Sequence, residues 1–207
     1  MTKTDLYNHA LSLLDLRIDT IDDNSKERRL VDLNYDKVVQ FVLKAWDFPY
    51  LIKKVSLTAD DVVDDEWKYL FGYSLPLDFG RVVQLGGTKD VGFSVRFGVL
   101  WTDYAEPILE YMPKDLEVDV DGNFTAPPDF MALVAYQLAL HVAPFLDPES
   151  QAMGNAAQLY QLTLQSIIES EAHSNDREDR YGAEDLWADD EAFSLIDYRR
   201  ALFEGSL

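Results

Sequence analysis

The spacing of the apolar residues changes twice along this chain of 207 residues, and this order limits the folds that it can adopt. Residues 5–16 and 26–46 repeat apolar side chains every three or four positions, as helices with one buried face do. The stretch 51–111 instead holds short extended segments separated by loops and turns, and residues 93–97 alternate strictly between apolar and polar, as half-buried strands do. Helical spacing returns over residues 128–143 and 150–171. We therefore expect an α+β fold: a helical bundle formed by the N- and C-terminal helices, with an inserted small antiparallel β unit.

Local signals place the ends of the expected helices. Thr4 can cap the first helix, and Pro49 ends the second because a residue before proline avoids the helical conformation. Pro128 suits the first turn of the third helix, where Asp129 would lie beside the positive end of the helix dipole. On the second helix we expect one stripe of six residues to face the core: Leu30, Leu33, Val38, Phe41, Val42 and Ala45.

We expect four successive parts in the chain. Residues 1–50 supply the N-terminal helices of the bundle, residues 51–126 the β insert, and residues 127–180 the C-terminal helices. Residues 181–207 form an acidic and aromatic tail. Ten acids and two bases fall within residues 169–191, yet large apolar residues follow, and disorder alone explains this combination poorly. We expect the tail to dock onto a partner or a neighbouring subunit through five anchors: Trp187, Phe193, Ile196, Tyr198 and Phe203. The alternative is a terminal helix that folds onto the bundle of its own chain.

Charge and composition argue against several classes of protein. The chain holds 38 acidic and 18 basic side chains, a net charge of −20, and such a surface repels nucleic-acid phosphates. The same charge equally suits solubility alone or a salt-adapted host. The basic residues form no stripe with interleaved aromatic residues, which argues against sequence-specific binding of nucleic acid. The chain has no cysteine, which excludes disulfides and thiolate metal sites. Its apolar runs fall short of the roughly 20 residues of a membrane span, so we expect no membrane partner.

No residue pattern predicts catalysis, a cofactor or a metal site. The segment from Asp119 to Asn123 begins like a calcium loop, but Phe124 replaces the glycine required at the sixth position and Phe130 the glutamate at the twelfth. We expect a turn there. Adjacent acids between residues 60 and 66 are typical of a solvated loop, because acid–base catalysis needs a buried carboxyl with a shifted pKa. The chain is therefore not expected to be an enzyme.

Several motifs, taken in order, resemble the tail tubular protein A family, the head-to-tail adaptors of short-tailed phages. The most specific is Tyr73-Ser74-Leu75-Pro76-Leu77-Asp78 followed by Arg81-Val82, which resembles a strand motif of that family. Each piece is weak alone, but the order and spacing of the pieces are specific. The remaining segments that resemble the family are residues 35–48, 93–100, 102–103, 107–111, 127–130, 132–143 and 158–160.

The resemblance implies a mechanical role. Adaptors of this family form a ring, commonly of twelve subunits, that lies below the portal, extends the DNA channel and receives the tail nozzle. The expected partners are therefore other copies of the chain, the portal protein, the nozzle protein and passing double-stranded DNA, which the chain does not bind sequence-specifically. The expected location is the tail or neck of the virion, after assembly in the host cytoplasm. A closed ring needs only one type of heterologous contact.

In such a ring the net charge has a physical role. Acids that line the channel would offer backbone phosphates no counterion, so DNA would pass without being trapped during ejection. The candidate channel-facing acids are Asp60, Asp61, Asp64, Asp65 and Glu66. Two alternatives remain open. An acidic DNA mimic or inhibitor would bind a basic partner as a stable monomer or dimer, and a small enzyme would reveal a buried carboxylate pair.

Overall fold

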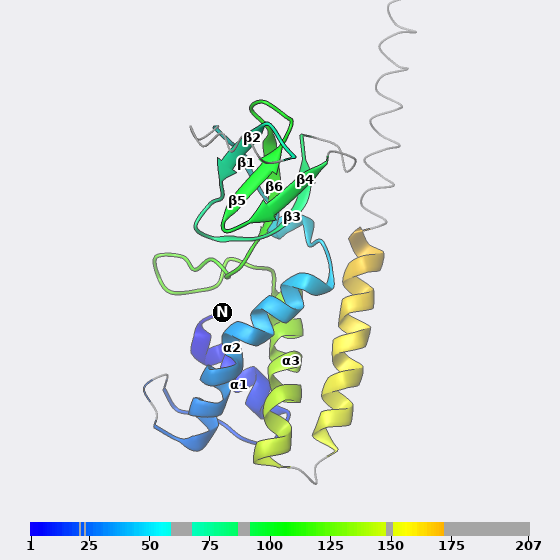
Figure 1. Cartoon of the computed structure of the whole chain (residues 1–207). Coiled ribbons are helices and arrows are strands. Elements are labelled where there is room, and N and C mark those ends of the chain that lie inside the picture. Colours follow the sequence, from blue (N-terminus) through cyan, green and yellow to red (C-terminus); the bar gives the residue numbers. More distant parts are fainter. Residues whose placement is uncertain (21, 23, 59–67, 87–91, 148–150, 172–207) are drawn as a thin grey trace, which may run out of the picture. The chain divides into compact units, whose positions relative to one another are not determined.

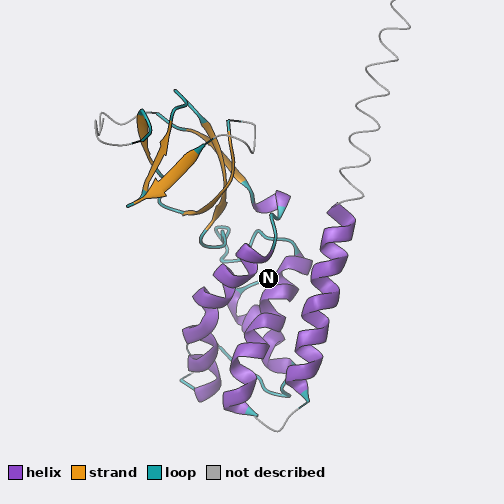
Figure 2. Cartoon of the chain, turned by 45° about the vertical axis from the view of Figure 1, so that its right-hand side comes forward, coloured by secondary structure: helices purple, strands orange, loops and turns teal. Residues whose placement is uncertain are grey.

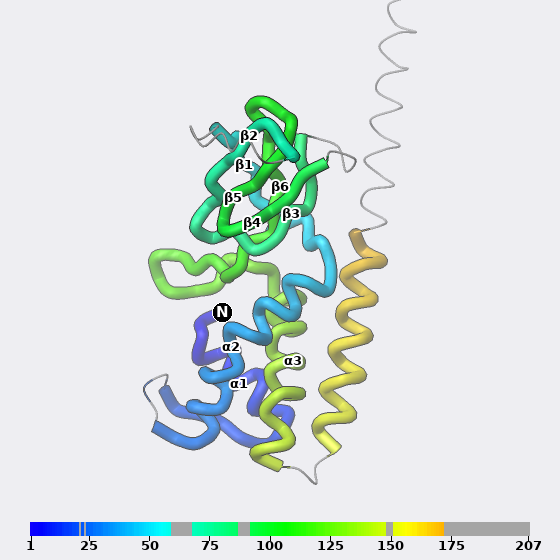
Figure 3. Tube along the Cα trace, in the orientation of Figure 1, coloured from blue at the N-terminus to red at the C-terminus, as the bar shows by residue number. Residues whose placement is uncertain are grey.

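The computed structural model describes residues 1–20, 22, 24–58, 68–86, 92–147 and 151–171. Residues Met1–Tyr160 form one compact unit, and a second unit begins at Gln161. Helices from both ends of the chain flank two small antiparallel sheets, so the expected α+β fold is confirmed. Figure 2 distinguishes the helices from the strands by colour, and Figure 3 shows the chain running from α2 into the strands and back to α3.

Helices α2 and α3 begin and end close to the expected positions. The helical elements are α1 (Lys3–Ser12), α2 (Lys26–Ala45), the short 3-10 helix η1 (Pro49–Leu51), α3 (Pro128–Leu146) and a fourth helix, α4, over residues 152–171. The strands are β1 (Lys53–Ser56), β2 (Phe71–Ser74), β3 (Phe79–Leu85), β4 (Phe93–Arg96), β5 (Val99–Thr102) and β6 (Ile108–Pro113).

Helix α1 begins two residues earlier than the sequence suggested. Its N-cap is Thr2 and not Thr4: the Thr2 hydroxyl accepts from the backbone N–H of Asp5, and the Asp5 carboxylate accepts from the backbone N–H of Thr2 at 2.9 Å. This reciprocal pair satisfies two backbone donors that the helix leaves unpaired. The helix ends at Ser12 and not near Leu16, and Asp15 then adopts a positive φ of 56°.

Helix α3 is the centre of the bundle, because both α1 and α2 pack against it (Figure 1). Phe48, just after α2, meets Phe130 of α3 edge to face, with ring centroids 4.9 Å apart. In the first turns of α4, Ala152, Ala156 and Tyr160 recur every four residues and are buried, so they share one face. The bundle core thus joins residues from both ends of the chain.

By length and composition alone, α3 could cross a membrane, since its mean hydropathy reaches 1.4 over 18 residues. More than half of that window is buried inside the protein. A core helix passes the same test, and the packing of α3 between α1 and α2 accounts for its apolar composition.

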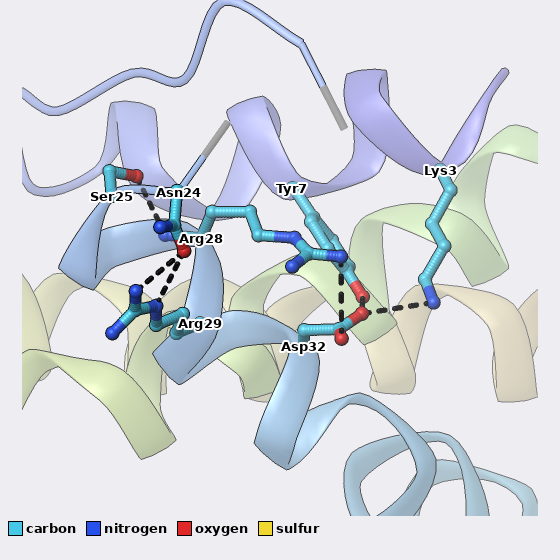
Figure 4. A network of polar contacts seen from close by, with 7 residues as sticks. All are labelled: Lys3, Tyr7, Asn24, Ser25, Arg28, Arg29 and Asp32. Carbon is cyan, nitrogen blue, oxygen red and sulfur yellow. Dashed lines mark hydrogen bonds and ion pairs between the residues drawn. The ribbon is translucent and has the colours of Figure 1, made fainter. Parts of the chain in front are cut away.

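A polar network ties α1 to α2 (Figure 4). The carboxylate of Asp32 in α2 accepts from the Tyr7 hydroxyl at 2.8 Å and from Lys3 Nζ at 3.2 Å, and it pairs with Arg28 at 3.6 Å. These donors stabilise the charged form and lower the pKa of Asp32, with the Tyr7 hydrogen bond as the largest cause. Burial is the main reason that the pKa of Tyr7 is raised. Arg28 therefore helps to hold α1 and α2 together through Asp32.

Each sheet has three antiparallel strands, in the orders β1-β6-β3 and β2-β5-β4. Buried side chains from both sheets form one cluster, to which the first sheet contributes Leu85, Leu109 and Tyr111 and the second contributes Tyr73 and Leu100. The two sheets therefore share a single apolar core and make one β unit.

Candidate functional site at the junction of α2, β3 and β6

The residues that the sequence singled out for function lie outside the described residues. These are the candidate channel acids and the tail anchors: Asp60, Asp61, Asp64, Asp65, Glu66, Trp187, Phe193, Ile196, Tyr198 and Phe203. Their roles remain predictions. The motif from Tyr73 to Val82 is described in full, and it leads to a different candidate site.

Tyr73 holds the β unit together from within. Its side chain is completely buried, and its hydroxyl donates to the carbonyl oxygen of Tyr104 at 2.6 Å while accepting from the backbone N–H of Glu106 at 3.1 Å. Glu106 has a positive φ of 56°, a conformation that non-glycine residues rarely adopt. Tyr73 thus fixes the turn between β5 and β6.

Asp78 connects the turn before β3 to both of the other strands of its sheet. Its carboxylate pairs with Lys53 of β1 at 2.6 Å and accepts from the Tyr111 hydroxyl of β6 at 2.9 Å. Lys53 also pairs with Glu117. The hydrogen bond from Lys53 is the largest cause of the lowered pKa of Asp78, and the same bond is the largest cause of the raised pKa of Lys53.

Arg81 joins β3 to the end of α2. Its guanidinium pairs with the carboxylate of Asp47 and donates to the carbonyl oxygens of Leu43 at 3.2 Å and Trp46 at 2.9 Å. The last carbonyl groups of a helix have no partner within the helix, so Arg81 acts as a cap contributed by the β unit. The Asp78 and Arg81 positions of the motif are therefore explained by the connection between strands and helix.

A cavity of about 150 Å³ opens beside Arg81, where α2, β3 and β6 meet. We call it the junction cavity. Both apolar and basic residues contribute to its lining. The lining residues are Gln40, Leu43, Lys44, Phe79, Gly80, Arg81, Met112, Pro113 and Lys114.

Gly80 allows the strands to approach closely at this cavity. A Cβ atom at this position would lie 2.8 Å from the backbone oxygen of Met112 and 2.9 Å from that of Pro113. Contacts below 3.0 Å with backbone atoms force a shift of the chain. The register irregularity between Phe79 and Arg81 in the pairing of β3 with β6 lies at the same place.

Three cations surround the junction cavity: Lys44, Arg81 and Lys114, which we call the cationic rim. Arg81 is engaged with Asp47. Lys44 and Lys114 are exposed, and within the described part of the chain no acid forms an ion pair with either. In a protein with a net charge of −20, this rim is a local site of attraction for an anionic group.

The core stripe expected on α2 is partly wrong, because some of its residues lie on the exposed side of the helix. Lys44 connects this exposed side to the cationic rim. The buried residues of α2 are Val31, Val38, Val39, Val42 and Leu43, whereas Leu33 and Phe41 are 69% and 52% exposed and Ala45 is exposed as well. Five exposed residues share the opposite side at helical spacing, and we call them the outer face of α2: Leu33, Lys37, Gln40, Phe41 and Lys44.

A second exposed apolar feature lies in the β unit. The turn between β4 and β5 consists of Phe97 and Gly98, whose φ angles are 52° and 78°, and the Phe97 side chain is fully exposed. Such a turn normally has asparagine and glycine, which tolerate these angles. Leu77 is also almost fully exposed. Two solvated apolar side chains in one small unit are consistent with a contact surface.

The segment that begins like a calcium loop is a turn, as expected. The Asp119 carboxylate accepts from the backbone N–H groups of Asp121 at 2.9 Å and Asn123 at 2.8 Å, and Gly122 has a φ of 78°. These backbone donors occupy Asp119. Across the described residues, no group of three histidine, aspartate or glutamate side chains could hold a metal ion.

Sequence reasoning missed the junction cavity and its rim. A signal existed on α2, where Leu33, Lys37, Phe41 and Lys44 repeat at helical spacing beside the valine stripe. Lys114 gave no signal, because it lies far from Lys44 in the sequence and only the tertiary fold brings the two to one cavity. No family model matches the chain, and no match is found among the curated proteins.

Proposed function

We propose that this chain is a structural head-to-tail adaptor of a tailed-phage virion. Copies of it form a ring below the portal, extend the DNA channel and receive the tail nozzle. In this proposal the chain performs no chemistry and carries no cofactor. The motifs that resemble the tail tubular protein A family suggest the role, and the α+β architecture with helices at both ends is compatible with it.

The outer face of α2 is the observation on which the proposal depends most. A helix that buries one face normally presents polar residues on the other, yet α2 exposes Leu33 and Phe41 there together with Lys37 and Lys44. Apolar residues mixed with lysines suit contact with a copy of the same chain, because every copy carries a net charge of −20. Contact between this face and a different face of the next copy is heterologous and can close into a ring.

The Arg81 and Asp78 contacts support a mechanical role in a second way. A subunit that transmits force between portal and nozzle needs its strands held firmly to its helices. Arg81 makes this connection through the carboxylate of Asp47 and the carbonyl groups of Leu43 and Trp46.

The test compares two single substitutions that each add one negative charge to an exposed apolar residue. Phe41→Glu changes the outer face of α2, and Val120→Glu changes a fully exposed turn residue outside it. Mass photometry and negative-stain images should reveal rings for the wild-type chain and for Val120→Glu, and mostly subunits for Phe41→Glu. Equal assembly of the two variants contradicts a role for this face. A wild-type chain that remains a monomer or dimer and binds a basic partner favours the DNA-mimic alternative.

A further inference from the structure

We propose that the junction cavity binds the C-terminal segment 186–193 of a neighbouring copy, with Phe193 in the cavity and the acids of the segment on the cationic rim. The inference rests on the proposed ring, since it needs a second copy within reach, and it names the place where the tail of that copy binds.

The size of the cavity and the apolar residues in its lining indicate which part of the ligand is buried. A cavity of about 150 Å³ with apolar residues in its lining is large enough for a group the size of benzene. Leu43, Phe79 and Met112 supply such a lining. The cavity is open to solvent on one side, so a side chain can enter while its backbone stays outside. A phenylalanine ring fits this description.

The rim defines the polar part of the ligand. Lys44 and Lys114 are exposed cations at the edge of the cavity, and Arg81 adds a third charge beside them. A ligand that places carboxylates there gains charge-assisted contacts at the edge of an apolar contact, where interfaces commonly carry their polar groups. The chemistry therefore selects an acidic segment with an adjacent aromatic ring.

The chain itself contains a segment of this kind. Residues 186–193 read Leu-Trp-Ala-Asp-Asp-Glu-Ala-Phe, with three consecutive acids two positions before Phe193. The charges of this segment and of the cationic rim are opposite, although the protein as a whole is strongly acidic. Insertion of the tail of each copy into the cavity of the next is a head-to-tail contact, the type that closes a ring.

Disulfide trapping tests this contact directly, because the chain has no cysteine of its own. One full-length variant carries Gln40→Cys at the cavity, and a second, differently tagged variant carries Ala192→Cys beside the proposed anchor. Mixing and mild oxidation should give a linked heterodimer at a yield at least tenfold above that of a control pair. The control combines Ala192→Cys with Val120→Cys, at an exposed turn outside the cavity.

Charge reversal adds a specificity test. Lys44→Glu with Lys114→Glu in the cavity variant should reduce the heterodimer yield at least fivefold, and Asp189→Lys with Asp190→Lys in the tail variant should restore it. Equal yields in all pairs overturn the proposal. Linkage that forms only when both cysteines are in one chain also overturns it, because the tail then binds its own subunit.

The mass of the assemblies separates this inference from the proposed function. Rings without the Gln40–Ala192 linkage overturn the cavity contact and leave the adaptor role standing. Linked copies that never form rings support the contact and contradict the adaptor role. Absence of both rings and linkage overturns both proposals.

Discussion

Replacement of Arg81 by alanine should loosen the connection between the β unit and α2. The substitution removes an ion pair with Asp47 and two hydrogen bonds to carbonyl oxygens, and it leaves those carbonyls without their donor. Arg81 and Asp47 are 30% and 43% exposed, so solvent screens the ion pair and its share is below about 1 kcal/mol. Each hydrogen bond from a charged donor adds about 1 kcal/mol after the same discount. We expect a total loss of about 2–3 kcal/mol.

Urea unfolding measures this loss, provided that the slope of the transition is unchanged. Arg29→Ala is the matched control, because Arg29 bonds only to the exposed side chain of Asn24 in the described structure, and its removal should cost below about 0.5 kcal/mol. The loss of stability in Arg81→Lys should lie between those of Arg81→Ala and Arg29→Ala, since lysine keeps the charge but cannot reach three acceptors in the same geometry. If Arg81→Ala is no more destabilising than Arg29→Ala, the connecting role of Arg81 is wrong.

Three further predictions concern single residues. Asp78→Asn should lower the free energy of unfolding by about 1 kcal/mol at pH 7. Because the pKa of Asp78 is lower in the folded chain, the unfolded chain binds more protons in acid, so this difference from wild type should vanish as the pH falls from about 4 through the folded pKa. A difference that stays constant with pH would refute this. Gly80→Ala should lower the free energy of unfolding, measured by heat or urea, by about 1–3 kcal/mol, because the added Cβ clashes with the backbone. Gly154→Ala on α4, where a Cβ meets nothing within 4 Å, should raise it by up to about 1 kcal/mol, and the reverse order would contradict the geometry. Phe97→Asn should stabilise the free protein by about 1 kcal/mol, since the exposed ring loses no packing and asparagine tolerates the positive φ; a loss of stability would mean that the ring packs in solution.

The architecture was predictable because apolar spacing differs between helices and strands. The change of spacing after Pro49 and its return at Pro128 place the β insert between helices from the two ends. The face of α2 was not predictable in the same way. Valines and a leucine occupy one side, and Leu33 and Phe41 the other, so periodicity alone leaves two apolar stripes to choose between. Packing against α3 decides the choice.

The junction cavity was beyond reach of the sequence for another reason. Lys44 lies in the last turn of α2 and Lys114 follows β6, 70 positions later. Two separate contacts bring them to one cavity: Phe79 of β3 pairs with Pro113 of β6, and Arg81 of β3 binds the end of α2. Register depends on many contacts at once, so a local pattern does not reveal it. The resemblance did draw attention to Asp78 and Arg81, whose contacts connect the sheet and the helix.

The adaptor role is tested most directly by co-expressing this chain with the portal protein encoded in the same genome and imaging the purified complex by electron microscopy. The account predicts a ring of identical copies, coaxial with the portal and with an open, acid-lined centre. A chain that stays monomeric and leaves the portal unbound, or a ring whose centre is lined by lysine and arginine, would contradict it.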